Sequence, residues 1–322
     1  MPSGSGRAPA SGLECVVNVS EGRDPRVVDR LGASCGAPLL DVHSDPHHNR
    51  TVFTLAGPTD MVERAARMLS SAAIAAIDFT EHDGRHPAFG VVDVVPFVPL
   101  HAAGTGGAAA SGAAASGAGA SGAGAGRTGR LAVGPPLDDA IAARDRFARW
   151  AGSELGVACH LYGPLPPNGH RTLPELRRAA GSTLAPDTGP TTPDPRVGRC
   201  AVGARHFLVA YNLWVTGDVD LARAVAADVR GPAVRALGLV LDGRSQISCN
   251  LVDPLTVGPA EVHDEVARRL EQVGAAVERC ELVGLLPAAA LATVPSRRHA
   301  ELGLTPERTI EARLEAAGLE LA

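Results

Sequence analysis

The residues best suited to acid–base chemistry stand in one polar loop, residues 81–90, which reads EHDGRHPAFG. The loop leads into an apolar segment whose near-alternation predicts a buried strand that ends at Pro96 and Pro99. A loop residue held at the end of a rigid strand is a common mounting for a reactive side chain. His86 is the candidate catalytic residue, because Pro87 biases its backbone toward an extended conformation and because an imidazole that titrates near pH ~6.5 can take or give a proton. On spacing alone, His86 could equally be a histidine that merely caps the strand.

A metal centre is the competing interpretation of the histidines in this part of the chain. The set comprises His43, His47, His48, His82 and His86. His82 and His86 have the i, i+4 spacing that zinc ligands use on a helix. Gly84 and Pro87 disfavour a helix at this place, so the spacing loses its geometric meaning. We therefore expect neither a bound metal nor a metallohydrolase.

Composition and charge restrict the class of protein. At 322 residues the chain is long enough for two ordinary cores, which must be built from Val, Leu, Ile and Ala because only 3% of residues are aromatic. A net charge of −5 without a basic block argues against nucleic acid or an anionic membrane as a partner. Six scattered cysteines without a Cys-x-x-Cys pair, a start unlike a signal peptide and no apolar run near ~20 residues predict a cytoplasmic protein with reduced thiols.

Hydrophobic periodicity predicts the same order of elements twice. The first unit has strands at 13–19, 38–42, 50–55 and 91–99, one helix from Pro25 capped by Asp24, and another capped by Thr59. The second unit has helices at 219–229 and after Pro259, and strands at 206–213, 236–241, 246–251 and 277–283, with a hairpin signal at Asp242-Gly243-Arg244. We therefore predict an α/β (α+β) fold of two related β-α-β-β-α-β, ferredoxin-like subdomains with a ligand cleft between them.

Three further segments complete the predicted organisation. Residues 102–126 contain only Ala, Gly, Ser and Thr, which indicates a flexible insertion within the first subdomain. A helix at 137–155 and a short strand at 157–162 follow it, and Thr305 is expected to cap a polar helix at 306–317. The predicted boundaries are 13–202 for the N-terminal subdomain, 203–292 for the C-terminal subdomain and 293–322 for a tail.

Seven motifs follow one another along the chain from about residue 13 to about residue 292. They are Cys15–Gly22, Asn49–Val52, His86–Pro87 with Gly90 and Asp93–Phe97, Leu161–Gly163, Asp187–Pro190 with Gly203–Arg205, Ser248–Leu251, and Leu282–Leu285. In this order they resemble the formiminotransferase domain of formiminotransferase-cyclodeaminase, in its single-domain bacterial type. One motif alone would say little, whereas seven collinear motifs are specific.

The resemblance implies transfer of the formimino group from N-formimino-L-glutamate to N5 of tetrahydrofolate, a step of histidine degradation and one-carbon metabolism. It also implies a homodimer, tetrahydrofolate as co-substrate without a metal, and catalysis by His86. N5 attacks the amidine carbon and glutamate leaves as an amine, so a histidine able to exchange a proton in both directions suits the chemistry. Relatives with two activities carry a cyclodeaminase domain after the transferase, and we expect a separate cyclodeaminase to act downstream of this chain.

Site residues are carried over position by position from the resemblance. The folate-contacting loop corresponds to Gly189, Pro190, Thr191, Thr192, Pro193, Asp194, Pro195, Arg196, Val197 and Gly198. Composition alone would make this loop an interdomain linker. Arg50 and Arg171 could clamp the carboxylates of glutamate or of the folate tail, as forked guanidinium groups do, or could be solvated surface residues. Further candidates for substrate binding are Asn18, Asp41 and Asn250.

The chain also departs from the family pattern. The family often has Asp-Val-Asp where this sequence has Asp41-Val42-His43, which leaves the carboxylate partner of His86 unassigned, and Ala88-Phe89 replaces a more polar pair. A related folate activity, such as formyl transfer or handling of 5-formyltetrahydrofolate, would fit the same site. A non-catalytic folate-binding protein would need the 189–198 loop but not His86.

Overall fold

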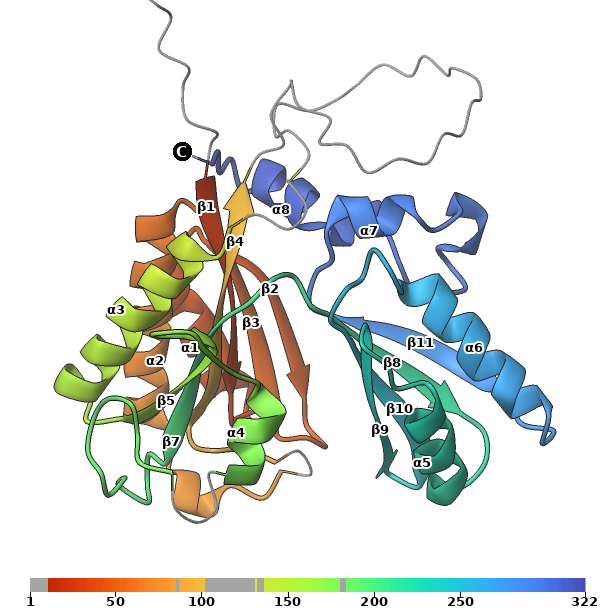
Figure 1. The fold of residues 1–322 in the computed structure, drawn as a ribbon, viewed down its shortest axis with the longest axis horizontal. Coiled ribbons are helices and arrows are strands. Elements are labelled where there is room, and N and C mark those ends of the chain that lie inside the picture. Colours follow the sequence, from red (N-terminus) through yellow and green to blue (C-terminus); the bar gives the residue numbers. More distant parts are fainter. Residues whose placement is uncertain (1–10, 85–86, 102–130, 132–135, 180–183, 322) are drawn as a thin grey trace, which may run out of the picture.

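The computed structural model describes residues 11–84, 87–101, 131, 136–179 and 184–321. His86 and the segment 102–126, for which we predicted flexibility, therefore lie outside the described residues. In the described part, two sheets turn toward each other and most helices cover their outer faces (Figure 1). The prediction of a mixed α/β fold with two subdomains is confirmed.

The first unit contains a seven-stranded sheet in the described part of the chain, ordered β2-β3-β1-β4-β7-β5-β6. Its elements are β1 (Ser11–Val19), α1 (Pro25–Cys35), β2 (Leu39–Asp45), β3 (Arg50–Gly57), α2 (Thr59–Ala76), β4 (Val92–His101), α3 (Asp138–Glu154), β5 (Ala158–Leu165), β6 (Gly169–Arg171), α4 (Leu173–Ala179) and β7 (Arg199–Ala204). A 3-10 turn, η1 (Phe79–Glu81), precedes the loop that contains His86.

The second unit contains a four-stranded sheet in the described residues, ordered β11-β8-β10-β9. Its elements are β8 (Val209–Val215), α5 (Val219–Asp228), β9 (Val234–Leu241), β10 (Arg244–Leu251), α6 (Pro259–Glu271) and β11 (Val277–Val283). In both units the strands adjoin in the order fourth, first, third, second, so the predicted repeat extends to topology.

Alternation along the strands sorts each sheet into an apolar face and a more polar face. On β1, Leu13, Cys15, Val17 and Val19 are fully buried against the helical layer of the first unit. On β8, the equivalent residues pack with α5 and α6. Since strand side chains alternate with a period of two, the residues between them point the other way, toward the opposite sheet.

Several local signals are confirmed. Asp24 accepts the backbone N–H groups of Arg26 and Val27, and therefore caps α1 as predicted. The β9–β10 hairpin turns through Asp242 and Gly243 with φ of 48° and 73°, the left-handed pair that a two-residue turn requires.

Other local predictions are corrected by the structure. Thr59 is the first residue of α2 and gives no cap, because Pro58 precedes it in the cap position. Strand β4 continues past Pro96 and Pro99 to His101. Its pairing with β1 keeps one register across both prolines and shifts only between Asn18 and Val19, opposite Val94 and Val92. Strand β7 runs to Ala204 and pairs with β4 there, and the subdomain boundary that we placed at 202 stays a prediction.

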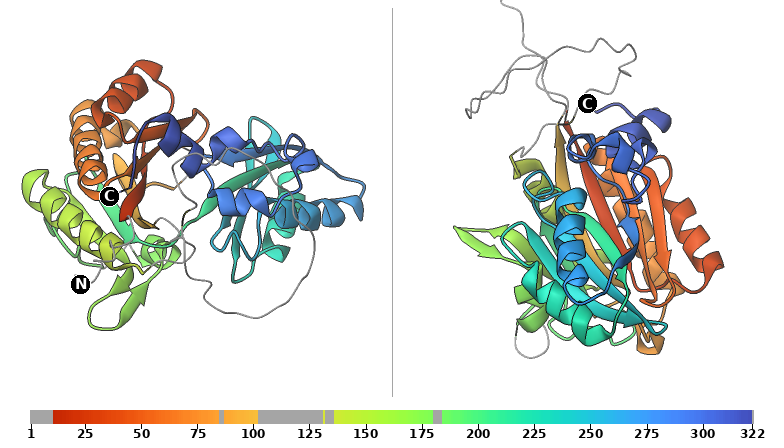
Figure 2. Two further views of the ribbon diagram at one scale, coloured as in Figure 1. Left: turned by 90° about the horizontal axis from the view of Figure 1, so that it is seen from above. Right: turned by 90° about the vertical axis from the view of Figure 1, so that its right-hand side faces the viewer.

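The segment after β11 lies against both units (Figure 2). It contains α7 (Ala288–Ala292), two 3-10 turns at Ser296–Arg298 and Pro306–Arg308, and α8 (Ile310–Ala316). The predicted helix at 306–317 is thus shorter, and Thr309, not Thr305, caps it by accepting the N–H of Ala312. Ile310 and Leu314 are buried on the first unit, so this helix is not wholly polar.

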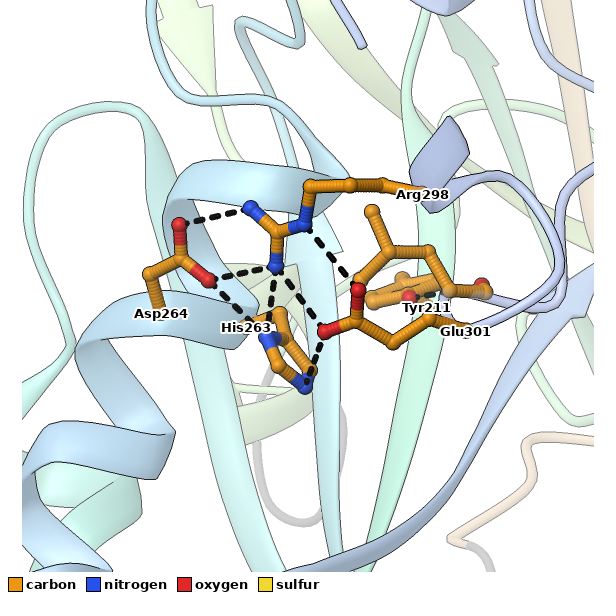
Figure 3. A network of polar contacts seen from close by, with 6 residues as sticks. Tyr211, His263, Asp264, Arg298 and Glu301 are labelled. Atoms are coloured by element: carbon orange, nitrogen blue, oxygen red, sulfur yellow. Dashed lines mark hydrogen bonds and ion pairs between the residues drawn. The ribbon is translucent and has the colours of Figure 1, made fainter. Parts of the chain in front are cut away.

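A cluster of charged side chains fastens this segment to α6 (Figure 3). The Arg298 guanidinium donates to Asp264 at 2.6 and 2.8 Å and to Glu301 at 3.1 Å, and His263 Nδ1 lies 3.0 Å from Asp264. The hydrogen bonds from Arg298 lower the pKa of Asp264 to about 2. We call Arg298, Asp264, Glu301 and His263 the tail cluster.

Candidate active site

A cavity of about 50 Å³ lies where the polar faces of the two sheets meet. The first sheet contributes His43, Asp45, His48 and Arg50, from the ends of β2 and β3 and the loop that joins them. The second sheet contributes Asn212, Ser248 and Asn250, from β8 and β10. We call this cavity the Arg50 pocket. It joins Arg50 and Asn250, two of the predicted substrate-binding residues.

The loop between β2 and β3 has the shape that its Asx residues dictate. Asp45 Oδ1 accepts the backbone N–H groups of His47 and His48 at 2.8 and 2.9 Å. Asn49 adopts φ of 46°, and its side chain accepts the N–H of Gly22 at 3.0 Å. These bonds fix the point at which Arg50 enters β3, and so direct its side chain into the pocket.

Arg50 is a cation without a partner in the described part of the chain. Its Nε is buried and forms no hydrogen bond there, and its guanidinium makes no ion pair with a described carboxylate. Burial lowers the pKa of Arg50, while the charges of Asp93 and Asp45 act in the opposite direction. A buried donor without an acceptor is costly, so the Arg50 Nε is a hydrogen-bond donor that the described chain leaves unused.

The pocket histidines are neutral at physiological pH. Burial lowers the pKa of both His43 and His48 below the ordinary value of 6.5. His48 Nε2 also lies 3.7 Å from Asp45, whose charge only partly offsets the burial. The pocket therefore combines the Arg50 guanidinium with neutral polar groups and with the Asp45 carboxylate, whose Oδ1 already accepts two N–H groups of its own loop.

A second polar group stands beside the pocket and holds the segment after His86. The buried carboxylate of Asp93 accepts the N–H of Phe89 at 2.8 Å and a guanidinium N–H of Arg177, on α4, at 2.7 Å. Arg177 also donates to the carbonyl of Pro87 at 2.5 Å, and its guanidinium lies 4.7 Å from the centre of the Phe89 ring. We call Asp93, Arg177, Pro87 and Phe89 the Asp93 clamp.

The predicted folate loop, residues 189–198, ends against the same segment. Val91 donates to the carbonyl of Val197 at 2.9 Å, and Arg199 donates to that of Phe89 at 2.8 Å. Gly198 has φ of 74°, and a Cβ there would lie 2.5 Å from the Cα of Gly90, so only glycine allows this approach. The start of β3, the start of β4 and the start of β7 share one edge of the sheet, which places the loop and the Arg50 pocket at that edge.

Three predicted substrate-binding residues make contacts within the chain. Asn18 lies on β1 and donates to the carbonyl of Val16 at 3.0 Å. Asp41 lies 3.8 and 3.9 Å from Arg308 and Arg313 of the C-terminal segment. Arg171 donates to Asp187 at 2.8 Å and to the carbonyl of Leu161 at 3.0 Å. Neither Asp41 nor Arg171 is among the residues that line the Arg50 pocket.

Sequence reasoning missed several residues of this region. Asn212 and Arg177 stood outside every motif, and no local pattern marked them. Asp93 and Ser248 stood inside motifs that we matched but to which we gave no role. His48 was considered only as a metal ligand. In the described residues, no three His, Cys, Asp or Glu side chains gather as a metal site, and no helix there is long and apolar enough to cross a membrane.

The fold and the site define a two-subdomain α/β protein with a polar pocket, containing Arg50, between facing sheets. Comparison with known proteins identifies its family. Residues 12–123 match the family "Formiminotransferase domain, N-terminal subdomain". The chain is 30% identical over 304 residues to glutamate formimidoyltransferase of Streptococcus pyogenes serotype M1, covering 88% of this chain and 91% of that protein. It belongs to the formiminotransferase family.

Two further relatives show the range of lengths in this family. The glutamate formimidoyltransferase of Thermoplasma acidophilum is 26% identical over 329 residues, covering 95% of this chain and 98% of that protein. The formimidoyltransferase-cyclodeaminase of Sus scrofa is 32% identical over 307 residues, covering 87% of this chain but 51% of that protein. The chain thus spans about half the length of such relatives with two activities.

Proposed function

We propose that this protein transfers the formimino group of N-formimino-L-glutamate to N5 of tetrahydrofolate, giving glutamate and 5-formiminotetrahydrofolate. The names of its relatives in Streptococcus and Thermoplasma support the reaction. The observation that carries it in this chain is Arg50, whose Nε is buried without a hydrogen-bond partner among described residues, at the same edge of the first sheet as the 189–198 loop. The donor substrate is a dicarboxylate, and a forked cation is the group that binds a carboxylate best.

In this proposal the Arg50 pocket holds a carboxylate of formiminoglutamate. Asn212, Ser248 and Asn250 face it from the second sheet and supply neutral hydrogen bonds. A cavity of about 50 Å³ has room for a carboxylate group but not for a pterin. The folate ring would therefore lie outside the pocket, along residues 189–198.

The chemistry requires proton transfer but no change in redox state. N5 attacks the amidine carbon, a tetrahedral intermediate forms, and the bond to the glutamate nitrogen breaks when that nitrogen receives a proton. We assign the proton transfer to His86, which the sequence places directly before Pro87 of the Asp93 clamp. His48, neutral because burial lowers its pKa, also lines the pocket.

Turnover of purified protein tests this assignment. With formiminoglutamate and tetrahydrofolate we expect glutamate and 5-formiminotetrahydrofolate, and with formylglutamate a much lower rate. His86→Ala should lower kcat by about 10²-fold, the usual contribution of a general acid–base, and leave tetrahydrofolate affinity unchanged. A preference for formylglutamate would favour the related formyl transfer, and wild-type kcat in the His86 variant would remove that residue from the mechanism.

The setting of the reaction is also part of the proposal. We propose a cytoplasmic homodimer that hands its product to a separate cyclodeaminase. All six cysteines are free and buried, which is consistent with a reducing compartment. Light scattering would give the oligomeric state. Ammonia released in step with transfer by these 322 residues would contradict the separation of the two activities.

A further inference from the structure

The Asp93 clamp has more contacts than a stabilising ion pair needs. Arg177 reaches three groups of one short segment: the Pro87 carbonyl, the face of the Phe89 ring and the Asp93 carboxylate. It comes from α4, a helix of only seven residues in which Leu176 is the buried side chain. The pair Arg177–Asp93 therefore joins a distant helix to the residues that directly follow His86 in sequence.

The clamped segment is continuous with the wall of the 189–198 loop. The Phe89 carbonyl accepts a hydrogen bond from the N–H of Arg199, and the Phe89 N–H donates to Asp93. Val91 binds the carbonyl of Val197, and Gly90 packs on Gly198 with no room for a side chain. A shift of Phe89 would thus be passed to Val197 and Gly198 through rigid backbone bonds.

We propose that Arg177 is a positioning residue, which through Asp93 and Phe89 holds the segment after His86 and the 189–198 loop in register for group transfer. This inference rests on the proposed function. Misplacement of reacting groups by about 1 Å can cost about 10² in rate even where no chemical group is lost. The role of Arg177 is therefore expected in kcat more than in KM for formiminoglutamate.

Arg146 and Glu63 provide a matched control. Glu63 is also a largely buried carboxylate, and Arg146 binds it at 2.5 and 3.1 Å between α3 and α2, on the outer helical layer. Replacing either arginine by Met leaves a carboxylate without its main partner. Only Arg177→Met removes contacts to residues 87–89, so a difference between the two variants isolates the positioning role.

The experiment measures kcat, KM, Tm and amide hydrogen exchange in Arg177→Met, Arg177→Lys, Arg146→Met and the double variant Arg177→Met with Asp93→Asn. We expect Arg177→Met to lower kcat by about 10²-fold and Arg146→Met to keep it within about twofold, with similar losses of Tm. Lys should restore part of kcat, because it can bind Asp93 but cannot also bind Pro87 and stack on Phe89. The double variant should recover Tm, since no unpaired carboxylate is left, without recovering kcat.

Amide exchange separates this inference from the proposed function. Exchange at Phe89, Val91 and Arg199 should rise in Arg177→Met and stay at wild-type levels in Arg146→Met, whatever the enzyme's substrate is. If the protein does not turn over formiminoglutamate but shows this exchange pattern, the proposed function is wrong and the positioning role of Arg177 is supported. Wild-type exchange at these amides, or equal kcat in Arg177→Met and Arg146→Met, overturns the positioning role.

Discussion

The tail cluster and the Arg50 pocket are built from the same residue types, yet they differ in what their arginine binds. The Arg298 guanidinium donates hydrogen bonds to the carboxylates of both Asp264 and Glu301 (Figure 3). Arg50 has two carboxylates in electrostatic range, Asp45 and Asp93, and hydrogen-bonds neither in the described structure. Asp45 is occupied by backbone N–H groups of its own loop, and Asp93 by Phe89 and Arg177.

The two regions differ in whether the arginine still has a donor without a described acceptor. In the tail cluster the folded chain satisfies every partner of the arginine, so the cluster can serve stability alone. In the Arg50 pocket the chain assigns the nearby carboxylates to other donors, and the cation keeps its binding capacity for a ligand. A charge left in this state is destabilising, which is consistent with the substrate-binding role that we propose for Arg50.

The largest expected effect is on turnover in Arg50→Met. Removing one side of a buried charge pair commonly costs 2–5 kcal/mol, so kcat/KM for formiminoglutamate should fall by about 10²- to 10³-fold. The free energy of unfolding should stay the same or rise, because an unpartnered buried cation is replaced by an apolar side chain of similar length. Steady-state kinetics and urea unfolding check both parts. A large loss of stability would mean that Arg50 is paired within the chain after all.

Glu14 is a buried carboxylate, and its pKa shows how strongly burial disfavours a charge in this fold. It lies on β1, is 4% exposed, and burial raises its pKa from 4.5 to about 7, although Arg205 lowers it in part. Below pH 4.5 Glu14 is protonated in both the folded and the unfolded state, and the fold has its full stability. As pH rises from 4.5 through 7, the unfolded state loses its proton more readily than the folded state, and stability falls. Glu14→Gln should therefore gain about 3 kcal/mol relative to wild type between pH 4.5 and pH 8. Urea unfolding of both proteins across this range measures it, and a constant difference would contradict the burial effect.

Arg298→Met tests the other side of the comparison. Loss of its charged hydrogen bonds should lower the free energy of unfolding by about 1–2 kcal/mol, a modest value because Asp264 and Glu301 are half exposed. We expect kcat/KM to stay within about twofold. The depressed pKa of Asp264 stabilises wild type above its ordinary pKa of 3.8 and is lost as pH falls toward 2, so this acid sensitivity should shrink in the variant. A kinetic defect without a stability defect would reverse the roles of the two regions.

The smallest effect is expected at an ion pair between the two units. His47 Nδ1 lies 3.2 Å from Asp242, whose side chain is 75% exposed. Exposed pairs contribute little because water screens them, so Asp242→Asn should change stability by less than about 0.5 kcal/mol. Asn also tolerates the left-handed backbone of this turn. A thermal melt with a control at high salt would detect a larger role for the pair.

The two β-α-β-β-α-β units, the β9–β10 hairpin and the cap of α1 could all be predicted from the amino-acid sequence. Each of these depends on residues close together in the chain, where periodicity and turn chemistry act directly. The seven motifs likewise identified the family, because a family is recognised by residue identity and order. The polar loop 81–90 and Arg50 could be singled out for the same reason.

Which polar residues have partners depends on the tertiary structure. Asp41 stood in the sequence as a substrate-binding candidate, but it faces Arg308 and Arg313, which lie some 270 residues further on. Arg177 had no signal at all, and it gained its contacts to Pro87 and Asp93 because α4 packs over the first sheet. Local patterns encode which face of an element is apolar. They do not encode which distant donor reaches a given acceptor first, and that competition left Arg50 without a partner in the described fold.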